Sequence, residues 1–182
     1  MIFERILIER ARSGDKQAAE QTVRRFYPAV SRFLRHLTWN HEDAQDLAQS
    51  TFLRAAQGLD EFRFQCTFNH WLHKIAYREY LRWLRDRREA LPIEEAASVL
   101  SAANCGTDLI LVFDALGRLE EGLRETFLLH EVEGFSVKET AGIMDVPEGT
   151  VKSRLARARE QLQRRLAALD PVLGATANGG TK

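Results

Sequence analysis

The stretch SVKETAGIMDVPEGTVKSRLARAREQL, residues 136–162, decides the fold of the second half of this chain. Ser136 and Glu139 have the S-x-x-E spacing of a capping box, which predicts the start of a short helix. The dipeptide at 145–146 leaves room for a tight turn, and Pro147 suits the first turn of the next helix. A short helix, a tight turn and a longer basic helix are typical of a helix-turn-helix.

The longer helix of this pair sorts into two faces at the helical period. Its apolar face is expected on the core side and holds Val151, Leu155, Ala158, Leu162 and Leu166. The opposite face centres on Ser153, Ala156, Arg157, Glu160 and Arg164, with Lys152 and Arg154 on its shoulders. In a major groove, central side chains reach base edges and shoulder cations meet phosphates. The pattern therefore predicts DNA binding, and the alternative is a solvated basic helix that binds nothing.

The composition is that of a globular protein, but its charge is unevenly distributed. The 182 residues are 45% hydrophobic and 29% charged, with 26 basic side chains against 26 acidic ones. Basic segments at 71–88 and 151–182 flank an acidic one at 89–150, so contact with nucleic acid at two chosen places is allowed. No 18 apolar residues run together, and 2 cysteines are too few for a disulfide framework. We expect a cytoplasmic protein.

Helical periodicity extends over almost all of the chain, and no run has the two-residue period of a strand, which predicts an all-α fold. Asp15 is expected to cap a first helix, and Pro28 predicts a break or kink in it before Val30. Asn40 is expected to cap a helix over 41–57 that ends near Gly58. The apolar face of the first helix is predicted to hold Ala19, Val23 and Phe26.

A long helix is predicted from Thr67 to Arg88. Its apolar face holds Phe68, Leu72, Ile75, Ala76 and Trp83. Beside that face runs a stripe of Lys74, Arg78, Arg82 and Arg85, with Trp71 at its border and Tyr77 and Tyr80 elsewhere on the polar side. Interleaved cations and aromatic rings are able to follow a phosphate backbone while stacking unpaired bases. The alternative is a core-packing helix whose arginines stay in water.

The sequence gives no pattern for metal, cofactor or catalytic chemistry. Cys66, His70 and His73 share a helical face, but a fourth ligand and an HExxH motif are missing. A phosphate-binding glycine loop, a G-x-S-x-G elbow and paired acids are missing as well. We therefore predict no metal, no cofactor and no catalytic residues. A small helical metal hydrolase would be the alternative, and it would need His70 or His73 for activity.

Three segments together resemble the bacterial extracytoplasmic-function sigma factors of the sigma-70 family. They are HEDAQDLAQSTFLRAAQGLDEFRF at 41–64, FNHWLHKIA at 68–76 and VPEGTVKSRLARAREQL at 146–162. The resemblance covers roughly residues 5–168 in the family order and implies an all-α protein with two small domains, sigma regions 2 and 4. It also implies a non-enzymatic factor that binds core RNA polymerase, reads −35 and −10 promoter elements and opens the DNA at −10.

The resemblance assigns three sets of contact residues by position. The set that docks on the polymerase clamp is Asp43, Asp46, Leu47, Gln49 and Phe52. The set for the −10 DNA is Phe62, Arg63, Phe64, Gln65, Trp71, Lys74, Arg78 and Arg82. The set for the −35 DNA is Lys152, Ser153, Arg154, Arg157 and Arg159. The partners implied are core RNA polymerase, through its clamp and flap, promoter DNA and an anti-sigma factor, without membrane insertion.

The implied domains are region 2 at 1–90, a flexible acidic linker at 91–107, region 4 at 108–170 and a disordered tail at 171–182. Three departures from the family pattern stand out. The common F-R-G-D-S-x-F loop reads Phe62-Arg63-Phe64-Gln65-Cys66-Thr67-Phe68, a small polar residue is often found at the Arg78 position, and the usual Leu-Pro is Leu119-Glu120. The alternative reading is a stand-alone helix-turn-helix regulator that binds duplex DNA without polymerase and whose first half senses a ligand or dimerises.

Overall fold

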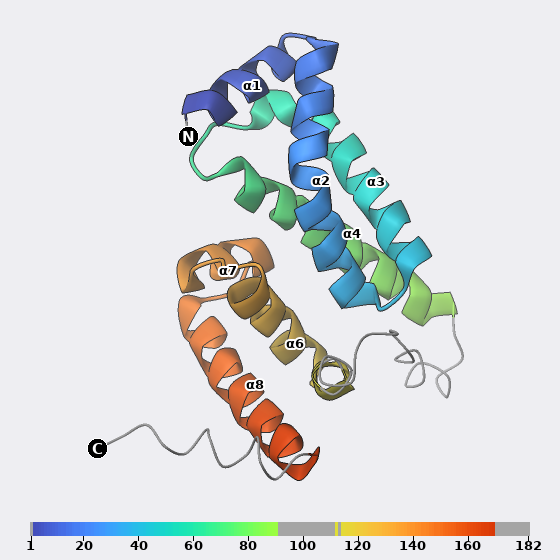
Figure 1. The fold of residues 1–182 in the computed structure, drawn as a ribbon, viewed down its shortest axis with the longest axis vertical. Coiled ribbons are helices and arrows are strands. Elements are labelled where there is room, and N and C mark those ends of the chain that lie inside the picture. Colours follow the sequence, from blue (N-terminus) through green and yellow to red (C-terminus); the bar gives the residue numbers. More distant parts are fainter. Residues whose placement is uncertain (1, 91–111, 113, 170–182) are drawn as a thin grey trace. The chain divides into compact units, whose positions relative to one another are not determined.

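The computed structural model describes residues 2–90, 112 and 114–169, and over these residues it is helical without a β-strand. The chain divides into two compact units (Figure 1). The all-α prediction is therefore confirmed. The predicted linker at 91–107 and the predicted tail at 171–182 lie outside the described residues. None of the helices in the described parts is long and apolar enough to cross a bilayer.

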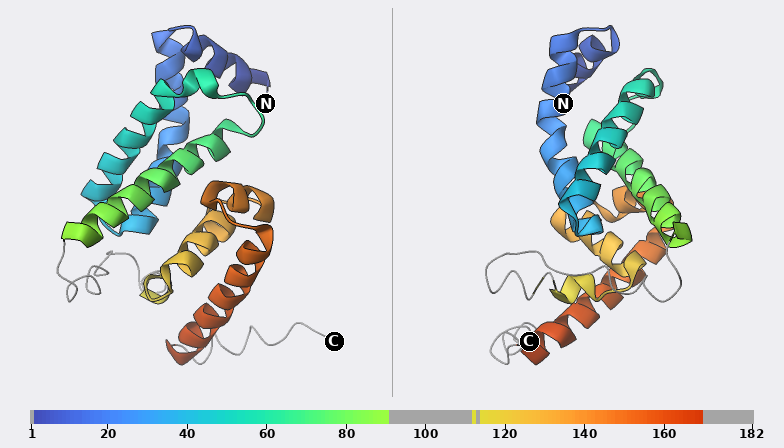
Figure 2. Two further views of the ribbon diagram at one scale, coloured as in Figure 1. Left: turned by 180° about the vertical axis from the view of Figure 1, so that it is seen from behind. Right: turned by 90° about the vertical axis from the view of Figure 1, so that its right-hand side faces the viewer.

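The first unit is a bundle around one long helix. Its elements are α1 (Ile2–Arg12), α2 (Lys16–Thr38), α3 (His41–Gln57), the 3-10 turn η1 (Leu59–Glu61) and α4 (Phe68–Ala90). Helix α2 packs against α1, α3 and α4, and α3 also packs against α4 (Figures 1 and 2). The largest fully buried side chains of this unit include Ile8 of α1, Phe33 and Leu34 of α2, and Leu72 and Tyr80 of α4.

Helix α2 begins at the predicted cap and does not break at Pro28. The Asp15 carboxylate accepts from the Ala18 amide at 3.1 Å and lies 2.5 Å from Nη2 of Arg10. These two contacts, the amide first, lower the pKa of Asp15. The helix runs through Pro28 without a break, because packing outweighs the proline, whose interior cost is about 3 kcal/mol. Phe26 and its neighbours on the same face, Val30 and Phe33, are buried on both sides of it, each contributing about 1.5–3 kcal/mol.

The buried face of α2 also differs from the prediction. Ala19 and Val23 are exposed, whereas Ala18 and Thr22 are buried together with Phe26. The Thr22 hydroxyl donates to the Ala18 carbonyl at 2.8 Å, so its polar group is satisfied inside the helix. A threonine bonded in this way packs like a small apolar residue, and this is why the hydrophobicity pattern placed the face one residue away.

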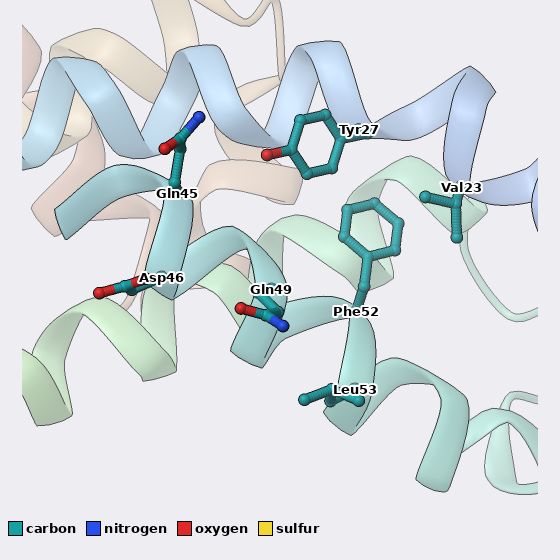
Figure 3. Close-up of a pocket in the computed structure, with 7 residues that line it drawn as sticks. All are labelled: Val23, Tyr27, Gln45, Asp46, Gln49, Phe52 and Leu53. Carbon is teal, nitrogen blue, oxygen red and sulfur yellow. The ribbon is translucent and has the colours of Figure 1, made fainter. Parts of the chain in front are cut away.

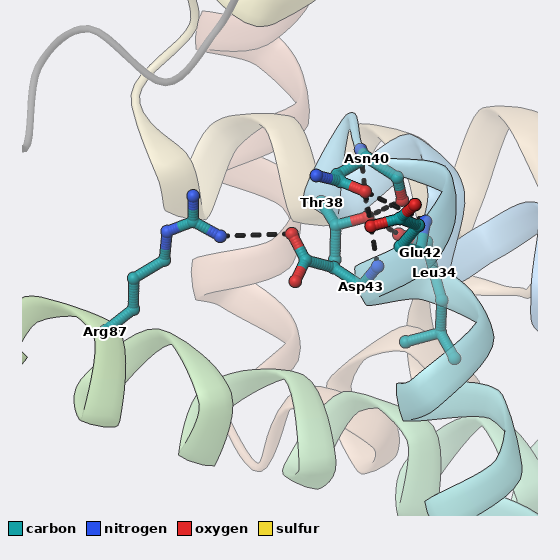
Figure 4. Close-up of polar contacts among 6 residues, drawn as sticks. All are labelled: Leu34, Thr38, Asn40, Glu42, Asp43 and Arg87. Carbon is teal, nitrogen blue, oxygen red and sulfur yellow. Dashed lines mark hydrogen bonds and ion pairs between the residues drawn. The ribbon is translucent and has the colours of Figure 1, made fainter.

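Helix α3 has the predicted bounds, from His41 to Gln57, and the predicted cap. The side-chain oxygen of Asn40 accepts from the Glu42 amide at 2.8 Å and from the Asp43 amide at 3.3 Å (Figure 4). Arg87, near the end of α4, donates to the Asp43 carboxylate at 3.0 Å. The beginning of α3 is thus fixed both by its own cap and by a neighbouring helix.

Helix α4 is buried over a wider arc than its sequence predicts. Tyr77 and Tyr80 were expected on the polar side, but they are 5% and 1% exposed. His73 and Glu79 are also buried. The reason is that α4 packs against both α2 and α3, so more than one face is covered, and a two-face sorting cannot detect a second neighbour.

The second unit contains the predicted helix-turn-helix. Its elements are a short helical segment at 114–117, α6 (Glu121–Phe127), the π-helical turn η2 (Leu128–Val132), α7 (Val137–Met144) and α8 (Glu148–Leu169). Ser136 and Glu139 form the capping box, and Asp145 ends α7 in the left-handed conformation at φ 58°. Val151 and Leu155 of α8 pack against Ala141 of α7. The sequence therefore predicted this motif from local signals alone.

Candidate nucleic-acid interface and partner-binding groove

Helix α8 separates its side chains into a core face and a solvent face as predicted. Val151, Leu155, Ala158 and Leu162 are buried, and Leu166 is half-buried. Lys152, Ser153 and Arg157 are exposed, and the Ser153 hydroxyl donates to the Thr150 carbonyl at 3.0 Å. The solvent face of the second helix thus presents Lys152, Arg157 and a hydroxyl, which suit phosphates and base edges in a DNA groove.

Two of the predicted arginines on α8 are held against other elements of the second unit. Arg159 lies 2.5 Å from the carboxylate of Glu131 in η2. Arg154 is half-buried over Gly122 of α6, where an added methyl group would lie 3.2 Å from its Cζ. Gly122 therefore leaves the space that the Arg154 guanidinium occupies. Sequence reasoning missed both contacts, because Glu131 and Gly122 lie far from α8 in the sequence.

The 62–67 loop, between η1 and α4, is built on an aromatic cluster. The ring of Phe62 lies 5.1 Å from that of Trp71 and 5.4 Å from that of Phe68, centroid to centroid. Phe62 is 3% exposed and Trp71 is half-buried, so both rings pack on the protein side of the loop. Arg63 and Gln65 are exposed and remain accessible to a ligand. Of the predicted −10 residues in the loop, Phe62 is therefore a core residue.

Phe64 has an unusual backbone for a bulky residue. Its φ is 55°, in the left-handed region, and it occupies the position where the F-R-G-D-S-x-F pattern has glycine. This conformation costs a non-glycine residue about 1–2 kcal/mol. The Phe64 ring lies 4.8 Å from that of Phe62, and the guanidinium carbons of Arg5 and Arg12 lie 5.0 and 5.5 Å from its centre. The replacement of the pattern's glycine by Phe64 was visible in the sequence, but the left-handed backbone and the ring contacts that go with it were seen only in the structure.

The basic stripe of α4 contains both exposed and engaged cations. Arg78 is exposed and Lys74 is half-buried. Arg82 donates to Glu79 at 2.9 Å, and Glu79 also lies 2.6 Å from Arg54 of α3. The i,i+3 spacing of Glu79 and Arg82 is a sequence signal for this pair that the stripe pattern concealed. Arg82 is therefore oriented by the protein, whereas Arg78 projects into solvent.

The cysteine and histidines near the start of α4 do not converge. His73 has no exposed surface, its Nδ1 lies 2.9 Å from the Asn69 carbonyl, and its ring packs against Phe33 at 5.2 Å. Cys66 is exposed in the loop. Within residues 2–90, 112 and 114–169, no three potential metal ligands come together.

An open groove of about 590 Å³ runs between α2 and α3 (Figure 3). Its apolar floor includes Tyr27 of α2 and Phe52 of α3, whose rings lie side by side with their centroids 5.8 Å apart. The residues lining this α2–α3 groove are Val23, Tyr27, Gln45, Asp46, Gln49, Phe52 and Leu53. Val23 and Leu53 are 40% and 59% exposed. Such a groove is suited to an apolar side chain of a protein partner.

The groove contains three of the five predicted polymerase contacts. Asp46, Gln49 and Phe52 line it. Asp43 does not line it and is paired with Arg87 instead. Leu47 is 7% exposed and belongs to the core. Sequence reasoning missed the contribution of α2, which supplies Val23 and Tyr27.

Comparisons with known proteins match both units. The family model for Sigma-70 region 2 matches residues 22–90, and that for Sigma-70, region 4 matches residues 109–162. The ECF RNA polymerase sigma-E factor of Haemophilus influenzae is 32% identical over an alignment of 186 positions, which covers 92% of this chain and 97% of that protein. The ECF RNA polymerase sigma factor SigM of Mycobacterium tuberculosis is 34% identical over 160 residues, 87% of this chain and 82% of that protein.

Two solved structures are similar over most of their length. One is the sigma factor RpoE in complex with the anti-sigma factor NepR from Bartonella quintana, with a TM-score of 0.68 and 32% identity, covering 81% of this chain and 95% of that one. The other is CnrH in complex with the cytosolic domain of CnrY, with a TM-score of 0.69 and 31% identity, covering 91% and 97%. The chain belongs to the extracytoplasmic-function sigma factors of the sigma-70 family.

Proposed function

We propose that this protein binds core RNA polymerase in the cytoplasm and directs it to promoters by reading two DNA elements. The observation that carries this proposal is the solvent face of α8. Lys152, Ser153 and Arg157 project from the second helix of a helix-turn-helix whose other face is buried in the second unit. Insertion of such a helix into the major groove brings the central Arg157 to base edges and the shoulder Lys152 to a phosphate. This surface reads the −35 element.

The −10 element is read by the 62–67 loop and the exposed side of α4. Arg63 and Gln65 are exposed on the loop, and Arg78 and Lys74 follow on the helix. Trp71 lies between them, half-buried on the aromatic cluster. Bases that leave the duplex are held by stacking and by cations along the strand. Capture of such a base favours the open promoter and drives melting.

The α2–α3 groove is the surface for core polymerase. Its floor of Tyr27 and Phe52 accepts an apolar side chain, and Asp46 at its rim selects a partner with basic residues nearby. An exposed carboxylate contributes less than about 1 kcal/mol to folding, so Asp46 gives the isolated domain little. A protein partner uses the same charge for register and specificity.

The test of the whole proposal is transcription from a promoter library by core polymerase with and without the full-length protein. We expect transcripts from a subset of promoters when the protein is present, and tight promoter binding when core enzyme is added. Tight, specific binding to duplex DNA by the protein alone would favour the stand-alone regulator and contradict the proposal.

The polymerase surface is tested by Asp46→Arg with Asp86→Arg as the matched control. Both residues are exposed acids of the first unit, but Asp86 is on α4 and does not line the groove. We expect both proteins to melt at nearly the same temperature as the wild type and Asp46→Arg alone to lose capture of core polymerase in a pull-down. A folded Asp46→Arg protein that captures polymerase normally would remove this residue from the interface.

An anti-sigma factor is the second proposed partner. RpoE was solved with the anti-sigma factor NepR, and CnrH was solved with the cytosolic domain of CnrY. By analogy with the first complex, we expect an anti-sigma partner that binds this chain, and we propose in addition that it competes with core polymerase. The test is the same pull-down of core polymerase, with the proteins that co-purify with this chain from its native cell added as competitors.

A further inference from the structure

The 62–67 loop is fastened from one side by α1, a helix that precedes the part of the chain matched by the region 2 family model. Arg12 donates to two backbone carbonyls, to Leu59 O in η1 just before the loop at 2.9 Å and to Phe62 O at the start of the loop at 2.5 Å. At the other end of the loop, the Glu4 carboxylate accepts from the Phe68 amide at 3.3 Å. Figure 1 shows α1 beside the segment that leads into α4. Both ends of the loop are therefore tied to one helix.

The middle of the loop is held by the same helix through Phe64. The guanidinium groups of Arg5 and Arg12 lie over the Phe64 ring, at 5.0 and 5.5 Å from its centre. Cation–π contacts of this kind favour one position of the ring. The ring also packs on Phe62, whose carbonyl is one of the two that Arg12 binds. Arg12 thus connects the backbone before Phe64 with the Phe64 side chain itself.

The contacts of α1 with the loop offset a backbone strain at Phe64. Phe64 has a φ of 55°, which glycine adopts without strain and a phenylalanine adopts only under constraint. Released from its contacts, Phe64 would return to an extended or right-handed backbone, and the loop would lose its shape. The fixed ring and the two bound carbonyls supply the constraint. The contacts of α1 therefore do for this loop what a glycine does in the F-R-G-D-S-x-F pattern.

We infer that α1 is a clamp for the −10 loop, in which Arg5 and Arg12 act as positioning residues that set the base preference of the 62–67 loop by holding Phe64 in its left-handed conformation. The inference rests on the proposed function, because it assumes that the loop captures a −10 base. Neither arginine needs to touch DNA for this role. Arg5 acts through the Phe64 ring, and Arg12 acts through that ring and through the carbonyls of Leu59 and Phe62.

The experiment measures binding of the full-length protein with core polymerase to single-stranded −10 oligonucleotides that carry each of the four bases at the captured position. The variants are Arg12→Ala, Arg12→Lys and Arg5→Ala. Arg10→Ala is the matched control, since Arg10 is on the same helix but binds Asp15 and has no contact with the loop among the interactions of the described residues. Core polymerase capture and the thermal melt are measured in parallel for every variant.

We expect Arg12→Ala to weaken binding of the preferred base about tenfold and to reduce the preference over the other three bases. The affinity falls because only a fraction of the loops keeps the competent shape, and about one in ten gives a tenfold loss. Arg12→Lys keeps the charge but cannot bind both carbonyls and a ring at once, so most of the loss persists. Arg10→Ala should behave as the wild type. Polymerase capture should not change in any of them.

Phe64→Gly separates positioning from direct contact with DNA. Glycine relieves the backbone strain and removes the ring, so Arg5→Ala should have almost no effect in a Phe64→Gly protein, whereas it weakens base preference in the wild type. Equal effects of Arg5→Ala in both backgrounds, or an equal loss for all four bases, would mean that Arg5 binds phosphate and would overturn the clamp. If the wild-type holoenzyme binds no −10 strand at all, it is the proposed function that fails. If it binds and the arginine variants match it, the clamp alone fails.

Discussion

Replacing Arg157 by alanine is expected to separate base reading from phosphate binding on α8. Arg157 is exposed at the centre of the solvent face, four residues beyond Ser153 and opposite the buried Leu155 and Ala158. Alanine is the best helix former and no buried contact is removed, so the protein should melt at its normal temperature. The change should therefore act on DNA binding alone.

The expected magnitude follows from the position of the side chain. An arginine that donates to a base edge contributes about 1–3 kcal/mol, so Arg157→Ala should weaken the preferred −35 sequence about 5- to 150-fold. The preference at one base pair should relax, because the other three bases never made that contact. Arg154 is half-buried against Gly122 at the edge of the face, where a cation meets phosphate. Arg154→Ala should weaken all sequences alike and lower the salt slope by about 1.

The assay is promoter binding by the full-length protein with core polymerase, over a set of templates that vary each −35 base in turn and over a range of salt concentrations. Arg159→Ala is the internal comparison, since Arg159 is paired with Glu131 and should change binding less than either. Equal losses for Arg157→Ala and Arg154→Ala on every −35 template would refute the assignment of Arg157 to a base and of Arg154 to the backbone.

Three further predictions follow from side chains whose contacts are defined. Trp71→Ala should lower the free energy of unfolding by about 2 kcal/mol, because the ring packs on Phe62 and Phe68. Its transcription defect should be largely rescued on a template that is already mismatched across −10. A defect that persists on this template would make Trp71 a core residue alone. Gly122→Ala should displace the Arg154 guanidinium and weaken all −35 templates alike, by less than Arg154→Ala, in the same binding assay; unchanged binding would remove Arg154 from the interface. Asp15→Asn should lower the melting temperature most at neutral pH, because the pKa of Asp15 is lowered in the folded state. The stabilising effect of the carboxylate is therefore present above its usual pKa near 4 and is lost as the pH falls through its pKa in the folded protein. A difference in melting temperature between variant and wild type that stays constant from pH 7 to 3 would contradict this.

The elements that could be predicted from the sequence are those fixed by local hydrogen bonds. Asn40 and Ser136 cap their helices with their own side chains, so the starts of α3 and α7 are encoded within four residues. The short turn at Asp145 is equally local, since it needs one residue in the left-handed conformation. These signals predicted the helix-turn-helix and the bounds of α3 without knowledge of the packing.

The expectations that were wrong depend on neighbours that are distant in the sequence. The break expected at Pro28 is missing because one face of α2 is buried on both sides of the proline, against α1, α3 and α4. Tyr80 was expected on the polar side of α4 and lies in the core, because α4 touches two helices. Helical periodicity gives the direction of a side chain relative to its own helix. It does not give the number of helices around it.

In the candidate site too, the sequence does not show which motif residues are exposed, and this decides which substitutions are useful in experiments. A resemblance transfers the position of a residue in a motif, but not its exposure. Leu47 and Phe62 are motif positions, and they are 7% and 3% exposed. Replacing either by alanine removes core packing at a cost of about 2–5 kcal/mol, so lost transcription would report on folding. Asp46 and Arg157 are motif positions that face solvent, where a substitution leaves the core intact. Variants of these two residues, and not of Leu47 or Phe62, therefore test contact with polymerase and DNA.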